Sequence, residues 1–172
     1  MELPPQGIAN GAVAATCELR RVLVIDDDEC IGAAIQAILA GRRCETVHES
    51  RACAGIQRLE QSAFDVVMID IFLKGLSGLD AIEYIRRGSS IPIIAMSGFR
   101  LRGSVDAVDY LAMAALRGAT FCMRKPFKSV QLIEAVERNS CARPIDPVKA
   151  HKLPDGDISK TAGLHAEAAY RA

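Results

Sequence analysis

Five polar side chains in this chain follow directly on apolar runs of strand length, and together they could carry out one kind of chemistry. They are a pair of neighbouring acids, a third acid, a hydroxyl and an ammonium group: Asp26, Asp27, Asp70, Ser97 and Lys125. The carboxyl ends of parallel strands meet at one edge of an open α/β sheet, where such folds place their ligands. We therefore expect these five residues to share one pocket.

Three carboxylates in one pocket need a cation beside them. Two carboxylates about 4 Å apart repel by roughly 4 kcal/mol at an effective dielectric constant near 20. Oxygen ligands without His or Cys suit Mg²⁺ that keeps some waters and takes a phosphate ligand. With Mg²⁺ and Lys125 neutralising phosphoryl oxygens and Ser97 donating a hydrogen bond, the set predicts phosphoryl transfer to the Asp70 carboxylate.

The segments that must position these residues alternate between two periods. Short apolar runs predict strands at residues 21–25, 44–48, 64–70, 91–96 and 119–123. Apolar stripes at helical spacing predict helices at residues 29–40, 50–59 with Ser50 as the cap, 78–87, 105–116 and 130–136. This alternation implies right-handed βαβ crossovers. The predicted fold class is α/β, a doubly wound five-stranded parallel sheet covered on both faces.

Composition excludes several classes of function. Among 172 residues, 21 Lys and Arg balance 21 Asp and Glu, so nothing indicates a general affinity for nucleic acid or anionic membrane. No window approaches the roughly 18 apolar residues of a membrane span. The first residues lack the basic start and apolar block of a secretory signal, so we expect a cytoplasmic protein.

The six cysteines and three histidines do not form a metal-binding pattern. No C-x-x-C pair is present, and none of His48, His151 and His165 lies near a cysteine cluster, which argues against zinc. In a cytosolic context we read the cysteines as reduced and mostly as packing residues.

The two ends of the chain lack the periodicity of its centre. Residues 1–19 are rich in Pro, Gly, Ala and Asn and are expected to form a flexible leader. Residues 140–172 carry prolines and scattered charge, so they cannot bury enough apolar area to offset the entropy lost on ordering. We expect one domain at residues 20–139, followed by a flexible tail without an output domain.

Over residues 20–139 the sequence resembles the receiver domain of two-component response regulators. The matching segments are Val22–Asp28, Val66–Asp70 with Gly78 eight positions on, Ile93–Gly98, Gly118–Ala119 and Lys125–Phe127. The resemblance implies a flavodoxin-like (βα)5 receiver fold and a cis peptide bond before Pro126.

The resemblance also assigns a role to each site residue. It implies that Asp70 accepts the phosphoryl group. It implies that Asp26 and Asp27, together with Asp70 and the backbone carbonyl of Phe72, hold Mg²⁺. Two residues would contact the phosphate: Ser97 as the switch hydroxyl and Lys125 as the phosphate-binding lysine.

Three features depart from the family's pattern. The family's proline four residues after the phosphoacceptor is Lys74 here, and its switch aromatic three residues before the lysine is Cys122. Phe121 is adjacent to Cys122 but on the opposite face of the strand. Segment 98–124 is longer than usual and includes Arg100-Leu101-Arg102, so we expect a remodelled output face.

The sequence therefore predicts a stand-alone, single-domain response regulator. A histidine kinase or a histidine phosphotransfer protein would pass a phosphoryl group to Asp70, and the changed site would bias a two-state surface. We expect output through a downstream protein target or onward phosphotransfer, without direct contact to nucleic acid or membrane, and the sequence leaves the oligomeric state open. Beyond slow self-dephosphorylation, the chain is not expected to be an enzyme.

Two other interpretations stay open at this point. A receiver-like module could signal by binding alone, because the family's proline and aromatic are missing. The run Val22–Asp28 also fits the opening motif of Mg²⁺ phosphohydrolases of the haloacid dehalogenase type, with Asp26 as nucleophile and Asp28 as acid/base. Against it, Asp155 and Asp157, the acids after the lysine, follow no apolar strand. In the receiver interpretation, Asp28 is expected to be a solvated acid in the first turn of the following helix.

Overall fold

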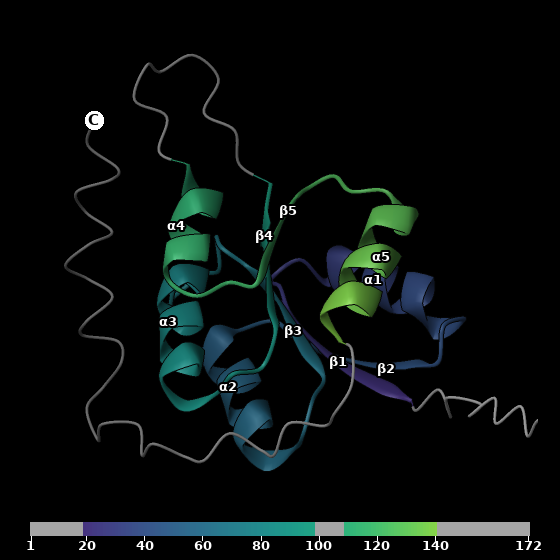
Figure 1. Ribbon diagram of the computed structural model, residues 1–172, viewed down its shortest axis with the longest axis horizontal. Coiled ribbons are helices and arrows are strands. Elements are labelled where there is room, and N and C mark those ends of the chain that lie inside the picture. Colours follow the sequence, from purple (N-terminus) through teal and green to yellow (C-terminus); the bar gives the residue numbers. More distant parts are fainter. Residues whose placement is uncertain (1–18, 99–108, 141–172) are drawn as a thin grey trace, which may run out of the picture.

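Five parallel strands in the order β2-β1-β3-β4-β5 form the central sheet of the computed structural model, which describes residues 19–98 and 109–140 (Figure 1). The strands are β1 Arg20–Ile25, β2 Cys44–Glu49, β3 Val66–Asp70, β4 Ile93–Ser97 and β5 Phe121–Arg124. The helices are α1 Glu29–Ala40, α2 Ala52–Gln61, α3 Gly78–Gly88, α4 Tyr110–Leu116 and α5 Ser129–Asn139. This order is the flavodoxin-like arrangement, so the predicted fold class is confirmed.

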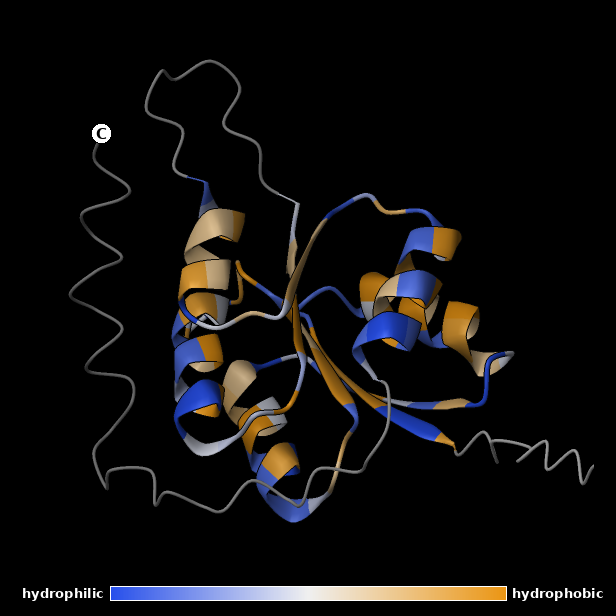
Figure 2. Ribbon diagram, viewed as in Figure 1, coloured by the Kyte–Doolittle hydropathy of each residue, from blue (hydrophilic) through white to orange (hydrophobic). Residues whose placement is uncertain are grey.

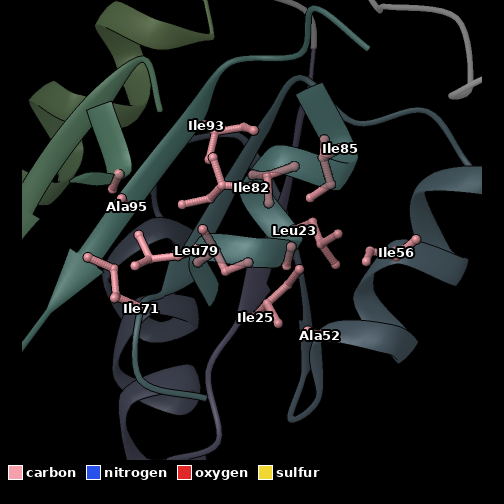
Figure 3. Close-up of a cluster of buried hydrophobic side chains, with 14 of the residues drawn as sticks. Leu23, Ile25, Ala52, Ile56, Ile71, Leu79, Ile82, Ile85, Ile93 and Ala95 are labelled. Carbon is pink, nitrogen blue, oxygen red and sulfur yellow. The ribbon is translucent and has the colours of Figure 1, made fainter. Parts of the chain in front are cut away.

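Helices cover both faces of the sheet, because successive strand residues point to opposite sides. On one face, Leu23 and Ile25 pack with side chains of α2 and α3, and Figure 3 shows this cluster. On the other face, Val22 and Val24 pack with side chains of α1 and α5. Figure 2 shows mainly hydrophobic central strands, flanked by helices in which hydrophobic and hydrophilic residues alternate. Burying each large apolar side chain contributes about 1.5–3 kcal/mol.

The start of helix α2 corrects one prediction. The N-cap residue is Arg51, without a capping hydrogen bond from its side chain, so the predicted cap Ser50 lies one residue too early. Helix α1, in contrast, has a capping side chain: Asp28 accepts a hydrogen bond from the backbone N–H of Cys30 at 2.9 Å. The acid predicted for the first turn of α1 is therefore its cap.

Several other element bounds also differ from the prediction. Strand β3 begins at Val66, although the apolar run begins at Phe64, which is buried without belonging to the strand. The later strands are shifted by one or two residues, with β4 starting after Pro92 and β5 ending at Arg124. An apolar run reports burial, whereas hydrogen-bonded partners decide where a strand begins and ends.

Helix α4 begins later than its apolar stripe suggests. Its N-cap is Asp109, whose carboxylate accepts hydrogen bonds from the backbone of Leu111 and Ala112. The helix predicted from residue 105 therefore starts at Tyr110 in the described part of the chain. The segment Arg100-Leu101-Arg102 lies outside the described residues, as do the predicted leader and tail apart from residues 19 and 140. The domain bounds stay predictions.

Arg86, near the end of α3, joins three segments through a partly buried guanidinium group. Its Nε and Nη2 donate to the carbonyl of Gly118 at 2.9 and 2.7 Å, and its Nη1 donates to the carbonyls of Ser89 and Ile91 at 3.0 and 2.9 Å. Burial lowers the pKa of this guanidinium. The helical pattern alone gave no sign of this role, because the carbonyl of Gly118 comes from a distant turn.

We expect an Arg86→Lys variant to lose about 1–2 kcal/mol of unfolding free energy, because a single ammonium cannot reproduce the planar donor set. Urea unfolding followed by far-UV circular dichroism measures this loss. The matched control is Arg87→Lys: Arg87 is exposed and paired with Glu83 on the same helix, so we expect a change within about 0.5 kcal/mol. Equal losses in the two variants would contradict the role of Arg86.

None of the helices in the described ranges has the length and apolarity needed to cross a bilayer.

Candidate functional site

The carboxyl edge of the sheet gathers the predicted site residues. Asp26 follows the last residue of β1, and Asp70 and Ser97 are the last residues of β3 and β4. In the register of the sheet, Asp70 lies opposite Met96, and Ser97 lies opposite Arg124, the residue before Lys125. Parallel strands in this register deliver all four side chains to the same rim.

The three acids form one cluster. Carboxylate oxygens of Asp26, Asp27 and Asp70 lie within 4.8 Å of one another. Asp26 is fully buried and Asp70 is 7% exposed, whereas 24% of the Asp27 side chain is exposed. The cluster therefore meets solvent on the side of Asp27.

Lys125 brings a positive charge to the buried side of this cluster. Its Nζ lies 2.6 Å from Asp26 Oδ2 and 3.2 Å from Asp70 Oδ2, with 14% of the side chain exposed. A cis peptide bond joins Lys125 to Pro126, as the resemblance to receiver domains implied. Lys125 thus bridges Asp26 and Asp70, which lie at the ends of two different strands.

Backbone contacts and Lys125 together fix the position of Asp26. Its Oδ1 accepts a hydrogen bond from the backbone N–H of Asp28 at 3.1 Å, and its own carbonyl is 2.8 Å from Nε2 of His48. Burial raises the pKa of the Asp26 carboxyl, and the hydrogen bond from Lys125 opposes that rise. A second cation at this cluster would favour the charged form of Asp26 further.

Ser97 and Phe72 are the other two predicted residues close to Asp70: Ser97 ends the neighbouring strand, and Phe72 lies two residues beyond Asp70. Ser97 is almost fully buried, and its carbonyl accepts a hydrogen bond from the backbone N–H of Lys125 at 2.8 Å. The backbone N–H of Phe72 donates to Asp70 Oδ1 at 3.4 Å. The Phe72 ring also meets the Tyr110 ring edge-on, with 4.9 Å between ring centroids. The loop after Asp70 is thereby in contact with the first residue of α4.

Cys122 occupies the position of the expected aromatic on β5. Its thiol is 3.3 Å from the carbonyl of Leu111 in α4, and burial raises the thiol pKa, so the structure gives no sign of an activated thiolate. Phe121 lies on the other face and is 44% exposed, as the alternation of strand residues predicts. Cys30 and Cys53 are exposed, so the prediction that the cysteines are mostly packing residues is wrong for these two.

The structure adds one contact that the sequence did not predict. Lys74 Nζ lies 3.2 Å from Asp27 Oδ2, at the solvent side of the acid cluster. The sequence marked Lys74 only as the replacement for a proline. The sequence pattern could not predict that Lys74 pairs with Asp27, because Asp27 follows β1 whereas Lys74 follows β3.

The donor set at this rim fits a hard divalent cation. The cluster offers carboxylate oxygens from Asp26, Asp27 and Asp70 and no sulfur or imidazole donor. Mg²⁺ prefers oxygen ligands, keeps several waters and is commonly held by one or two carboxylates plus a phosphate. An ammonium group beside the acids matches a phosphate ligand in the same pocket.

Comparison with known proteins places this geometry in a family. The family model for the response regulator receiver domain matches residues 22–137, more than half of the chain. The chain belongs to the response regulator receiver family. This match and the flavodoxin-like sheet confirm the resemblance noted from the sequence, and receiver domains act as phosphoacceptors rather than as classical enzymes.

Similar proteins span several bacterial groups. The DNA-binding response regulator MtrA of Mycobacterium leprae is 25% identical over 139 residues, covering 81% of this chain. The alignment spans only 59% of the length of MtrA. Among solved structures, the receiver domain of NtrX from Brucella abortus is 30% identical, with a TM-score of 0.62, and the match covers 69% of this chain and 97% of that one.

One neighbour in fold is described with a metal. The receiver domain of the sensor histidine kinase PA1611 from Pseudomonas aeruginosa has a magnesium ion coordinated in its active site cleft. It is 21% identical, with a TM-score of 0.60, and the match covers 72% of this chain and 98% of that domain. At this identity the likeness shows a shared fold.

The haloacid dehalogenase alternative finds no support at this receiver site. In that reading Asp28 would be the acid/base, but its carboxylate caps helix α1 through the N–H of Cys30. The family match also covers the run Val22–Asp28, on which the alternative was based.

Proposed function

We propose that this receiver domain accepts a phosphoryl group on Asp70 from a histidine kinase or a histidine phosphotransfer protein. The observation that carries the proposal is the setting of Asp70. Its carboxylate ends a buried strand, shares a cluster with Asp26 and Asp27, and lies 3.2 Å from the Lys125 ammonium. A carboxylate beside a cationic group and a metal-binding cluster is suited to receive a phosphoryl group.

In the proposed transfer, an oxygen of Asp70 attacks the phosphorus of a phosphohistidine. The new O–P bond forms as the N–P bond breaks, and the electron pair of that bond stays on the imidazole nitrogen of the donor. Asp26, Asp27 and Asp70 would hold Mg²⁺, and by family resemblance the carbonyl of Phe72 would join them. When bound, the metal supplies positive charge for the phosphoryl oxygens.

In this proposal, Lys125 and Ser97 contact the oxygens of the phosphoryl group. The Lys125 ammonium, now shared between Asp26 and Asp70, takes a phosphoryl oxygen in place of part of that contact. The Ser97 hydroxyl, at the end of the neighbouring strand, donates to another phosphoryl oxygen. These new contacts favour one arrangement of the rim and thereby bias the surface near α4.

The output of this receiver is proposed to run through a downstream protein or onward phosphotransfer. Several relatives are named as DNA-binding or transcriptional regulators, and this chain spans about three fifths of MtrA. These names do not support the expectation of no direct contact with nucleic acid. That expectation, the stand-alone organisation and the cytoplasmic location stay predictions.

The experiment that tests the proposal uses the full chain, acetyl phosphate and Mg²⁺. We expect the intact mass to rise by one phosphoryl group within minutes, and we expect chelation of Mg²⁺ by EDTA to abolish this gain. The physical reason is that the acid cluster repels an incoming phosphate until a divalent cation neutralises it. Mass spectrometry of the intact chain measures both results. No gain at any Mg²⁺ concentration would favour the alternative module that signals by binding alone.

A further inference from the structure

Every carboxylate of the acid cluster has an ammonium group beside it. Lys125 lies 2.6 Å from Asp26 and 3.2 Å from Asp70, and Lys74 lies 3.2 Å from Asp27. The two lysines differ in setting, because 14% of the Lys125 side chain is exposed and 89% of the Lys74 side chain is exposed. Lys125 therefore acts from inside the fold, whereas Lys74 reaches the cluster from its solvent side.

The charges of these groups nearly balance before any metal is bound. Three carboxylates face two ammonium groups, so the local formal charge is close to −1 when all are ionised. A divalent cation that joins this set meets two positive charges already in place. Because Asp27 is the most exposed of the three acids, an incoming metal first meets the carboxylate that Lys74 holds.

We propose that Lys74 competes with Mg²⁺ for Asp27 and so sets the metal affinity of the unphosphorylated receiver. The inference rests on the proposed function, because it assigns the acid cluster to Mg²⁺. Lys74 Nζ lies 3.2 Å from Oδ2 of Asp27, one of the three carboxylates that would hold the metal. Binding of the metal therefore has to break or share this ion pair, which weakens the net affinity.

The sequence position of Lys74 makes this competition a property of the loop after β3. Lys74 lies four residues beyond Asp70, between the end of β3 and the start of α3. A proline at this position, as in the family's pattern, carries no charge and offers no contact to Asp27. The replacement thus adds a cation at the rim without changing any of the acids.

Isothermal titration calorimetry of the full chain with Mg²⁺ alone tests this role. We expect Lys74→Met to bind Mg²⁺ about two- to fivefold more tightly than the wild type, the range set by an exposed ion pair. Methionine keeps an unbranched apolar side chain and removes the charge. Lys74→Arg, which keeps the charge, should restore an affinity close to that of the wild type.

The charge-matched control is Arg138→Met. Arg138 lies in the last turn of α5, is exposed and pairs with Glu134 one turn earlier. Helix α5 runs from the loop after Lys125 away from the rim. We expect no change in Mg²⁺ affinity there, because screening removes the effect of distant surface charges. A second control is the Asp27→Asn background, in which Lys74→Met should leave the reduced affinity unchanged, since the competing pair is gone.

The outcomes separate this inference from the proposed function. If the wild type binds Mg²⁺ and is labelled by acetyl phosphate, but Lys74→Met binds no more tightly, the inference fails alone. The same holds if Lys74→Met tightens binding equally in the Asp27→Asn background, because the lysine would then act without its partner. If the wild type shows neither Mg²⁺ binding nor labelling, both proposals fail.

Discussion

An Asp70→Asn variant is expected to take up no phosphoryl group from acetyl phosphate, whereas the wild type gains one per chain. The amide of asparagine lacks the anionic oxygen that would attack phosphorus. The fold should tolerate this change, because the side chain keeps its shape and one of three clustered negative charges disappears. Intact mass spectrometry of both proteins in Mg²⁺ measures the labelling, and circular dichroism verifies the fold.

The matched control for this prediction is Asp28→Asn. Asp28 is an acid two residues beyond Asp26, and its side chain caps α1. Asparagine caps helices about as well as aspartate, so we expect this variant to fold and to be labelled like the wild type. Labelling of Asp70→Asn at the level of the wild type would exclude Asp70 as the acceptor.

A Gly78→Ala variant is expected to lose about 3 kcal/mol of unfolding free energy or more. Gly78 begins α3 and packs directly on the end of β3, where a Cβ atom would overlap the backbone carbonyl oxygen of Asp70. That carbonyl belongs to a buried central strand and cannot move without disturbing the sheet, so overpacking here has no easy relief. Urea unfolding followed by far-UV circular dichroism measures the loss.

Gly41→Ala is the control for Gly78→Ala. Gly41 caps the end of α1 with a φ of −81°, and a Cβ atom there would meet nothing within 4 Å. We expect a change within about 0.5 kcal/mol, or a slight gain from the lower entropy of the unfolded chain. If both glycines tolerate alanine equally, the close approach of Gly78 to Asp70 does not constrain this fold. Any folded Gly78→Ala protein should also be labelled more slowly, because its clash lies at the phosphoacceptor.

The order of the elements could be predicted because each one carries a local period. Leu23 and Ile25 alternate with Val22 and Val24 along β1, and the structure buries these pairs on opposite faces of the sheet. The rim residues could be predicted for a related reason. A buried parallel strand that ends on an acid, as at Asp70, exposes that acid at the carboxyl edge.

The bounds of elements were harder to predict, since they depend on partners elsewhere in the chain. Phe64 belongs to the apolar run but not to β3, because the strand begins only where its ladder to β1 begins, at Val66. Asp65, just before it, is held to Arg21 in two ways: its backbone N–H donates to the Arg21 carbonyl, and its carboxylate accepts from the Arg21 backbone N–H. Ser50 is a good capping residue by type, yet α2 begins one residue too late for it to act.

The sequence alone determined the layering of this receiver domain and the strand ends on which its acids and Lys125 lie, because hydrophobic period and strand polarity are local properties. The folded arrangement of the loops, in contrast, sets which ammonium group meets which carboxylate. The pairing of Lys74 with Asp27 joins two different strand ends, and Arg86 joins the carbonyls of Ser89 and Ile91, just after α3, to that of Gly118. Such contacts depend on how closely loops approach one another in space, and a repeating pattern in the sequence does not predict the distance between two loops.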